Sequence, residues 1–410
     1  MNKTIVITGI GILSPIGIGR ASFWEALAQG KTGFKQISLF DTSRFNVHVA
    51  GEIEFDPVQF LGKKGLRDLD RSTKLVNTAA KLAIDESKLE ITEANSPRMG
   101  VAIGTTFGSL HSISQFDRTG LIEGPRSVNP SHFPNTVLNS PASQISIRFN
   151  IKGFNTTIST GFCAGLDALY YAADFIKLNR ADVILTGAVE ELCEETFLGF
   201  HNVGYLSGAE GAEPISCPFD KRRSGAILSE GAAVLVMEDK EHAVKRDAHI
   251  LAQVMGCGNA FDPFNKRGYN PQGIGLKNAI TLALKDASLS PKDIGYICSC
   301  ANSTKDLDRM ETQVIKDIFG ENAYTIPVSS IKSMVGESFS ASGAFSLVAA
   351  VGVLENGLIP PTANYHEKDP ECDLDYVPNK AREKQINRVL VTAADPYGQN
   401  TAIVLGRYGG

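Results

Sequence analysis

Short runs of β-branched and aliphatic residues alternate along the whole chain with longer segments that have the apolar spacing of helices. In the first part of the chain, strands are expected over residues 4–8, 99–103, 156–159, 181–188 and 232–237. Helices are expected over residues 23–27, 75–87, 138–149 and 166–178. Strands that alternate with helices favour an α/β fold in which helices cover mostly parallel sheets.

The same order of elements recurs after about residue 246. Strands are expected over residues 250–255, 294–300, 324–329, 389–393 and 401–405, and helices over 275–286, from about 310, and over 341–355. The first strand is expected to close at Gly9, before a loop rich in glycine and proline, and the strand from 250 to end in Gly256-Cys257-Gly258. The pattern predicts two halves, residues 1–245 and 246–410, with about five strands each. The halves share no sequence-level identity, so this prediction concerns architecture only.

Two of the expected helices differ from the others in polarity. The segments 166–178 and 345–354 are apolar around most of their circumference. Helices of this kind are usually buried between layers, so we expect helices in the interior of the molecule.

Composition and charge narrow the class of partner. The 410-residue chain, with 43% hydrophobic and 21% charged residues, has the make-up of a soluble globular protein. Its formal charge of −5 argues against nucleic acid or an anionic membrane as partner, and no apolar run reaches the ~18–20 residues of a membrane span. Seven scattered cysteines without an export signal favour the cytoplasm. Cys298-x-Cys300 lacks the second pair of a zinc site, and we expect no metal and no cofactor.

The segment 156–169 has the pattern of a strand, a tight turn at Gly161 and a helix. A side chain at the start of such a helix lies beside unpaired backbone N–H groups, which together with the helix dipole lower the pKa of a thiol. This is a suitable place for a cysteine nucleophile. Phe162 and Cys163 both lie at this turn, and the chemistry depends on which of them occupies the nucleophile's position.

Several motifs together resemble the β-ketoacyl-acyl-carrier-protein synthases, the condensing enzymes of the thiolase-like fold. They are Val6-Ile7-Thr8-Gly9-Ile10-Gly11 with Ser14-Pro15-Ile16-Gly17, the turn 160–169, the strand 181–187, Pro218-Phe219-Asp220 with Gly225 and Glu230-Gly231-Ala232, Asp308-x-x-Glu311-Thr312, and Ser329-Ser330-x-Lys332-Ser333. The resemblance covers nearly the whole chain. It implies a duplicated five-layer α-β-α-β-α sandwich with mostly parallel sheets.

In that family a cysteine accepts the acyl chain from a carrier protein, and two histidines stabilise the charge that forms on decarboxylation of malonyl-carrier protein. Matching the family's turn on Gly165 puts Phe162 at the cysteine's position and Cys163 one residue late. One residue at a helix start turns a side chain by about 100° and moves it ~1.5 Å, whereas reacting atoms must meet within ~3–3.5 Å. We therefore interpret Cys163 as a buried small side chain, with a relocated nucleophile as the alternative.

The positions of the two histidines are also changed. The resemblance places Cys300 at the first position and Glu337 at the second, and none of the seven histidines falls at either. A carboxylate cannot donate a hydrogen bond to a developing enolate unless it is protonated. Asp308, Glu311 and Lys332 match the family and are interpreted as ion pairs and caps of the scaffold. The glycine-rich loop near the C-terminus of active members is replaced by residues 394–400.

A chain that keeps the motifs of the family but has other residues at the positions of the cysteine and the two histidines resembles the chain-length factor. This is the non-catalytic subunit that pairs with a catalytic ketosynthase in type II polyketide synthases. Many such subunits carry glutamine at the lost cysteine, whereas this chain has Phe162. The resemblance implies a heterodimer along the strand near 156–159, and an acyl carrier protein that brings malonyl and polyketide chains. The alternatives are an active synthase that uses Cys163 with Glu337 as a base, and a transacylating or acyl-binding relative.

Two surface features follow from this hypothesis. Phe107, Leu110, Ile113 and Phe116 are the candidate lining of the acyl tunnel, although their spacing also fits an ordinary amphipathic helix. Lys63, Lys64 and Arg67, near Arg71, form a candidate docking patch for an acidic carrier protein, and Lys221-Arg222-Arg223 form a second basic run. Charge runs of this kind are more often solvated faces.

Overall fold

The computed structural model describes residues 3–264 and 268–409. Its strands are β1 (Ile5–Ser14), β2 (Gly17–Ile18), β3 (Lys35–Gln36), β4 (Val49–Ala50), β5 (Met99–Gly104), β6 (Asn155–Ile158), β7 (Val183–Glu190), β8 (Gly231–Asp239), β9 (Ala252–Phe261), β10 (Tyr296–Cys298), β11 (Val328–Ser329), β12 (Leu358–Ile359), β13 (Arg382–Glu383), β14 (Arg388–Ala394) and β15 (Gln399–Gly406). Its α-helices are α1 (Arg20–Ala28), α2 (Pro57–Leu61), α3 (Arg71–Ser87), α4 (Leu110–Ile122), α5 (Ser140–Phe149), α6 (Ala164–Lys177), α7 (Glu194–Asn202), α8 (Lys240–Lys245), α9 (Ile274–Asp286), α10 (Lys305–Phe319), α11 (Lys332–Val335) and α12 (Ser340–Asn356).

The main sheet is built from two runs of five strands in the same order. The first run is β6-β5-β7-β8-β1 and the second is β11-β10-β14-β15-β9, so each places its strands in the order third, second, fourth, fifth, first. In each run the fifth strand is antiparallel to its neighbours, and the other four point the same way. An antiparallel contact between β1 and β9 joins the two runs. The strand order thus repeats, while the boundary between residues 245 and 246 stays a prediction.

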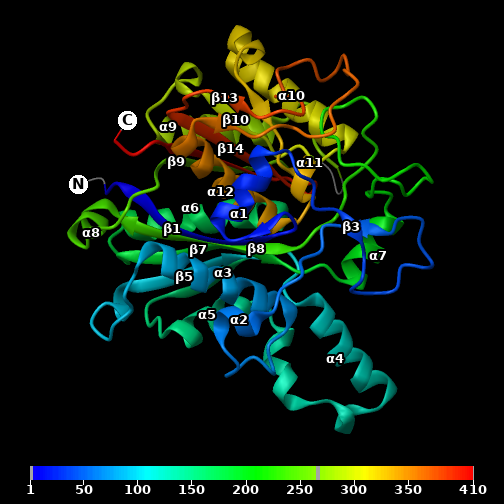
Figure 1. Ribbon diagram of the computed structural model, residues 1–410, viewed down its shortest axis with the longest axis vertical. Coiled ribbons are helices and arrows are strands. Elements are labelled where there is room, and N and C mark those ends of the chain that lie inside the picture. The colour runs from blue at the N-terminus through cyan, green and yellow to red at the C-terminus, as the bar shows by residue number, and fades with distance from the viewer. Residues whose placement is uncertain (1–2, 265–267, 410) are drawn as a thin grey trace.

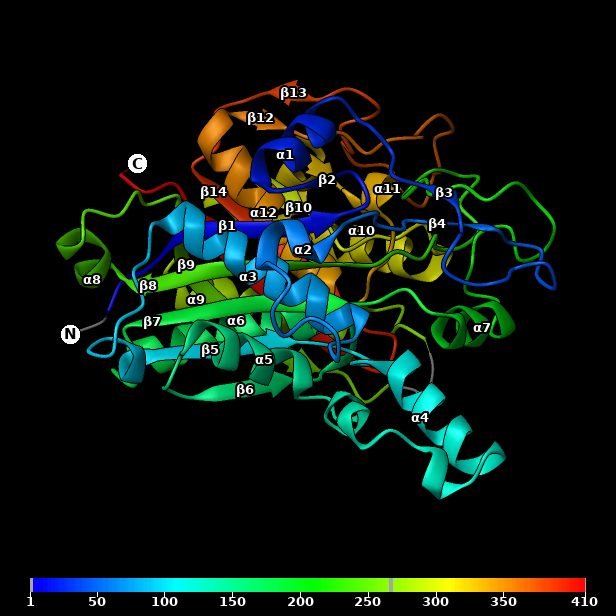
Figure 2. The same cartoon turned by 60° about the horizontal axis from the view of Figure 1, so that its bottom comes forward.

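Alternate side chains of the strands enter different layers. On β8, Val234 and Val236 pack in the cluster that includes α3 and α5, whereas Leu235 and Met237 face the cluster around α6 and α12. On β14, Leu390 faces the cluster around α9 and α10. Figure 1 and Figure 2 show α6 and α12 between the two halves of the sheet, with α3 and α5 on one outer face and α9 and α10 on the other. The predicted five-layer sandwich is confirmed.

The first strand continues past the glycines that were expected to close it. A Cβ atom on Gly9 would lie 2.4 Å from the carbonyl oxygen of Ala83, and one on Gly11 would lie 1.9 Å from that of Ala79. Both carbonyls belong to α3, so the glycines allow helix and strand to touch. The prediction that a loop begins at Gly9 is therefore wrong, since β1 reaches Ser14.

The second half repeats this contact. On β9, Gly256 and Gly258 meet the carbonyl oxygens of Ala283 and Ala279 of α9, and a Cβ atom at either glycine would lie 2.3 Å from the nearer oxygen. The expected end of the strand at 256–258 is wrong for the same reason, because β9 continues to Phe261. In both halves these glycines serve helix–strand packing.

Two other expected boundaries also differ. The strand predicted over 324–329 is limited to β11, because residues 320–324 form a 3₁₀ helix. The helix expected from about 310 begins at Lys305, where Asp306 and Asp308 place negative charge on its first turn.

Two helices meet in the interior of the sandwich. Residues Ser340 to Leu354 of α12 are all buried, as the apolar segment predicted. Gly165 of α6 lets the two helices approach, because a Cβ atom there would lie 2.3 Å from the carbonyl oxygen of Ser340. Among the described residues, no helix is both long and apolar enough to cross a membrane.

Candidate functional site

The turn between β6 and α6 places Phe162 in an aromatic cluster. A short 3₁₀ helix, η4 (Gly161–Cys163), follows the strand and leads into α6. The Phe162 ring is 4% exposed, and its centroid lies 5.0 Å from that of Phe339, 6.2 Å from Phe200 and 6.3 Å from Tyr205. The position that the resemblance assigns to a cysteine is filled by a packed ring.

Phe107 and Phe339 complete this cluster. The ring of Phe107 lies edge-on to Phe339 at 5.2 Å, and Phe339 stacks on Phe200 at 4.8 Å. Such pairs each contribute roughly 0.5–1.5 kcal/mol beyond the area that they bury. Phe339 has a φ of 50°, which non-glycine residues rarely adopt, so the surrounding packing holds it there.

A hollow of about 600 Å³ lies over Phe162. Its aromatic lining comes from Phe107, Phe162, Phe200, Phe261 and Tyr397. None of the described residues that line it carries a thiol, an imidazole or an amine, and the one carboxyl among them is that of Asp395. The hollow can hold an apolar group but offers it no thiol nucleophile.

The thiol of Cys163 faces away from this hollow. Cys163 is fully buried in the central core, and its Sγ donates to the carbonyl oxygen of Gln399 at 3.3 Å. Burial raises the pKa of this thiol well above its usual value, and the nearby carboxylates of Asp167 and Asp395 raise it further. Both effects disfavour the thiolate that a nucleophile needs.

A carboxylate occupies the N-terminal end of the α6 segment. Asp395 accepts hydrogen bonds from the backbone N–H groups of Phe162, at 2.9 Å, and Tyr397, at 2.7 Å. Its own N–H donates to the carbonyl oxygen of Gln399 at 2.8 Å. Burial raises the pKa of the Asp395 carboxyl, although the two N–H groups oppose that shift. The sequence showed that the loop 394–400 was altered but not this contact.

Glu337, at the second histidine position, is held by four donors. Its carboxylate oxygens accept from Lys332 at 2.8 Å, Asn302 at 2.8 Å, the Phe339 N–H at 2.9 Å and Ser342 at 2.8 Å. Burial lowers the pKa of Lys332, but the charge and hydrogen bond of Glu337, together with the charges of Cys300 and Glu311, outweigh burial, and the pKa is raised. The pair is therefore a buried ion pair with satisfied hydrogen bonds.

Cys300, at the first histidine position, is buried at the end of β10. Its backbone N–H donates to Glu311 at 3.1 Å, and burial together with the charge of Glu311 raises the pKa of its thiol well above the usual value. Asp308 accepts from the N–H groups of Phe219 at 2.8 Å and Asn302 at 3.0 Å. Burial raises the pKa of Asp308 to about 7. These carboxyl groups tie loops together beneath the site.

Sequence reasoning missed Phe200 and Phe339 of the aromatic cluster, and also the polar contacts of Asn302 and Tyr205. Asn302 donates to the hydroxyl oxygen of Tyr205 at 2.7 Å as well as to Glu337, and so links the aromatic cluster to the ion pair. Tyr205 follows α7 and carries no spacing signal of its own. The motif around Asp308 brings Asn302 near the site, which is the only signal that could have indicated it.

The four residues of the candidate tunnel lining do not lie together. Phe107 lies in the hollow over Phe162, whereas Phe116 packs against Phe133 at a centroid distance of 5.9 Å. Leu110 and Ile113 lie between them on α4 and are half-buried. Helix α4 has no buried residue, and in Figure 2 it projects from the body of the molecule.

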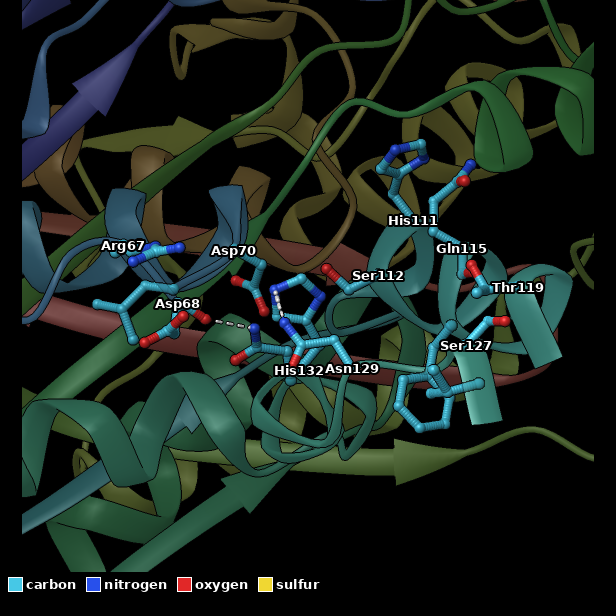
Figure 3. A pocket seen from close by; sticks show the side chains of 14 residues that line it. Arg67, Asp68, Asp70, His111, Ser112, Gln115, Thr119, Ser127, Asn129 and His132 are labelled. Carbon is cyan, nitrogen blue, oxygen red and sulfur yellow. Dashed lines mark hydrogen bonds between the residues drawn. The ribbon is translucent and has the colours of Figure 1, made fainter. Parts of the chain in front are cut away.

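A second hollow of about 420 Å³ lies beside α4. Figure 3 shows Arg67, Asp68 and Asp70 on one side of it and residues of α4, among them His111, on the other. The Asn135 side chain donates to the backbone carbonyl of Asp68 at 2.6 Å and ties the two sides together. Because Arg67 and residues of α4 line the same hollow, Arg67 lies near the projecting helix.

The structure separates the two predicted basic clusters. Lys63, Lys64 and Arg67 are exposed, on the loop between α2 and α3. Arg223 is 2% exposed and pairs with Asp369, so it does not belong to an exposed basic run, whereas Lys221 and Arg222 are exposed. Arg71, which lies near the first cluster in sequence, pairs instead with the buried Glu230.

The end of the sheet and the projecting arm are two further features of the surface. Strand β6 ends the strand order and pairs with β5. The arm consists of α4 and the 3₁₀ helix η3 (Pro130–Thr136), and Leu121 and Ile122 on it are 86% and 70% exposed. An unpaired strand edge and large exposed apolar groups are each typical of an interaction surface.

Comparisons with known proteins agree with this architecture. The family model "Beta-ketoacyl synthase, N-terminal domain" matches residues 2–243, and "Beta-ketoacyl synthase, C-terminal domain" matches residues 251–366. The chain is 37% identical over 408 residues to "3-oxoacyl-(acyl-carrier-protein) synthase 2" of Coxiella burnetii, with 99% of each chain covered. It is 38% identical over 415 residues to "Tetracenomycin polyketide synthase ketoacyl synthase alpha subunit" of Streptomyces glaucescens, which covers 99% of this chain and 97% of that protein.

Solved structures give the same result. "The ishigamide ketosynthase/chain length factor" superposes with a TM-score of 0.93 at 31% identity and covers 100% of both chains. The complex described as "type II PKS acyl-carrier protein in complex with its ketosynthase bound to the hexaketide" superposes with a TM-score of 0.92 at 30% identity, covering 99% of this chain and 100% of that one. The fold is thiolase-like. Since the family models match most of its length, the chain belongs to the β-ketoacyl synthase family.

Proposed function

We propose that this chain is a non-catalytic chain-length factor that pairs with a catalytic ketosynthase in malonyl-carrier-protein-dependent condensation. The observation that carries the proposal is the Phe162 ring, which packs in an aromatic cluster at the position of the family's nucleophile. A benzyl side chain cannot accept an acyl group. The role left to the subunit is to shape the tunnel in which its partner's product grows.

The surroundings of Phe162 support this proposal. Cys300 is buried, with no imidazole to offer, and Glu337 is engaged by Lys332 and three further donors. A group that stabilises an enolate must donate a hydrogen bond or carry positive charge. Neither position meets that requirement, so decarboxylation of a malonyl group has no support at this site.

An active synthase or transacylase that uses Cys163 is the competing function. It requires the thiol to reach a substrate, whereas Cys163 lies in the central core with a raised pKa. Intact-mass analysis after incubation with acyl-carrier protein tests it. We expect no adduct on Cys163, and a stable thioester there would overturn the proposed function.

The partner surface follows from the edge strand and the arm. Among the described strands, β6 ends the sheet and has an edge that another sheet can extend, and the arm exposes Leu121 and Ile122. Among similar structures, one is described as a ketosynthase/chain length factor and another contains an acyl-carrier protein with its ketosynthase. We infer the same two kinds of partner for this chain, and the exposed Lys63, Lys64 and Arg67 suit the acidic carrier protein.

Co-expression with the partner ketosynthase and carrier protein tests the proposed function. We expect a heterodimer on sizing, and a polyketide whose mass changes when the arm is altered. Phe116→Ala should lengthen the product, because it removes an aromatic ring of the projecting arm that we propose lines the tunnel of the partner. Phe107→Ala is the matched comparison within this chain's own hollow, and the proposal gives it the smaller effect. If both variants leave the product mass unchanged, the tunnel-lining role is wrong.

A further inference from the structure

The start of α6 is a natural anion site that the protein has filled from within. Backbone N–H groups at the beginning of a helix lack partners inside the helix and attract negative charge. Here the Phe162 N–H donates to Oδ2 of Asp395, and the Tyr397 N–H donates to Oδ1. The N–H of Asp395 is itself bonded to the Gln399 carbonyl, so three backbone donors around this point are already in use.

The fit of the carboxylate is close. Gly161 has a φ of 62°, and a Cβ atom there would lie 2.0 Å from Oδ2 of Asp395. The turn can therefore hold this carboxylate only because residue 161 is glycine. Among the described residues that line the hollow over Phe162, none brings a positive charge against Asp395.

We propose that Asp395 is an internal anion that blocks acyl transfer at this turn, so that a cysteine in place of Phe162 would still not take up an acyl group. The inference rests on the proposed function and adds a second cause of inactivity, the Asp395 carboxylate, to the loss of the thiol. It assigns the inactivity of the subunit to the loop 394–400 as well as to residue 162.

The chemistry of acyl transfer explains why the Asp395 carboxylate would prevent the reaction even with a thiol present. A thiolate at residue 162 would add to the carbonyl carbon of an acyl thioester and form a carbon–sulfur bond, and the negative charge would move to the carbonyl oxygen. The carbon–sulfur bond to the original thiol would then break, and that thiol would leave as a thiolate and take up a proton. The attacking thiolate and the oxyanion both need donors, and at this turn a carboxylate holds the donors and repels both anions. Of the other nearby carboxylates, Glu337 is paired with Lys332, and Asp167, on the first turn of α6, accepts hydrogen bonds from the side chains of Thr160, Gln399 and Thr401. Asp395 is the carboxylate that holds the Phe162 N–H, and the described residues that line the hollow offer it no cation.

The reactivity of the thiol in a Phe162→Cys variant measures the effect of Asp395 directly. All seven native cysteines are buried, so the wild-type chain gives a low background of alkylation by iodoacetamide. The alkylation rate is measured against pH in Phe162→Cys and in the double variants with Asp395→Asn or Asp395→Ala. The Asn change removes the charge and keeps an acceptor, whereas Ala removes both. A small acyl donor, an octanoyl thioester of N-acetylcysteamine, then tests acyl transfer by intact mass without carrier docking.

We expect the single variant to react slowly at pH 7 and to form no thioester. Both double variants should react at least tenfold faster because the thiol pKa falls by one unit or more, and the Ala double variant should form the thioester. If the single variant is acylated as fast as the double variants, or if neither change at Asp395 speeds alkylation, the proposal is wrong. Should the Ala variant fail to fold, the Asn variant makes the same comparison. None of these readouts depends on the partner or on product length, so they fail separately from the proposed function.

Discussion

The hollow around Phe162 and the arm formed by α4 and η3 are close in the chain but differ completely in packing. The floor of the hollow is buried and hydrogen-bonded, with an aromatic cluster above an ion pair whose acceptors are satisfied. The arm has no buried residue in α4 and exposes Leu121 and Ile122. The turn with Phe162 is part of a packed apolar cluster, whereas helix α4 of the arm has no buried residue.

This difference means that the floor of the hollow contributes to the stability of the chain, whereas the arm is free to interact with a partner. Residues in the floor, such as Phe162 and Lys332, contribute to the fold of this chain and have no free group for catalysis. Residues of the arm contribute little to the fold and are available to a partner. A subunit that acts through its partner would need both features, and the following experiments, from the largest expected effect to the smallest, test whether the two regions differ in this way.

Lys332→Met is expected to have the largest effect. It leaves the buried carboxylate of Glu337 without its cation, and breaking a buried pair typically costs about 3–5 kcal/mol of unfolding free energy. Urea unfolding measures the loss. The double variant Lys332→Met/Glu337→Gln should recover part of the stability, because no unpaired charge remains. Equal stability of the wild type and Lys332→Met would show that the floor is not held by this pair.

Leu121→Asp/Ile122→Asp should weaken binding of the partner to the arm without destabilising the fold. Both side chains are mostly exposed, so the unfolding free energy should change by less than about 0.5 kcal/mol. Charges on an apolar interface are costly, and co-purification with the partner ketosynthase should fall at least tenfold. Val244→Asp, which is 57% exposed on α8 away from the arm, is the matched control. Normal pairing of the double variant would remove the arm from the interface.

Glu191 joins the start of α3 to the start of α4 and should give the stability a pH dependence. Its carboxylate accepts from the first turns of α3 and α4, through the N–H groups of Ser72 at 3.3 Å and His111 at 3.1 Å. Burial, and then the charge of Asp70, raises its pKa to about 8. The folded state therefore binds a proton that the unfolded state releases near pH 4.5, and this contribution is lost as the pH rises towards 8.

Urea unfolding of the wild type and Glu191→Gln between pH 5 and 8 measures this effect. The wild type should lose stability relative to the variant by up to about 1 kcal/mol per pH unit. The comparison between the two proteins cancels the titration of all other groups. Parallel curves would mean that Glu191 does not titrate in this range.

Lys63→Glu/Lys64→Glu should have the smallest effect on the chain itself. Both side chains are exposed on a loop, so the unfolding free energy should stay within about 0.5 kcal/mol of the wild type. Binding of an acidic carrier protein to the heterodimer should weaken several-fold at low salt and converge with the wild type at high salt. Lys292→Glu, exposed in the other half, serves as control. Unchanged binding would assign the docking surface to the partner subunit alone.

Part of the site followed from the sequence alone. The turn at Gly161, the place of Phe162 and the scaffold role expected for Asp308 rest on local spacing, which adjacent residues determine. The contact of Asp395 with the Phe162 N–H joins residues 233 positions apart, and no local pattern encodes it. The partner of Glu337 is closer in sequence, yet its bond to Lys332 depends on burial that only the packed layers create.

The order of strands and helices along the chain, the interior helices and the presence of Phe162 at the turn were determined by the sequence, because periodicity and residue identity are local properties. The tertiary structure decided where strands continue through Gly9 and Gly256, since close contact with a helix, and not chain flexibility, required those glycines. It also decided that Cys163 faces the core and that Phe107 and Phe116 lie in different regions. Direction and burial of a side chain depend on which distant segments pack against it, and that information exists only in the folded chain.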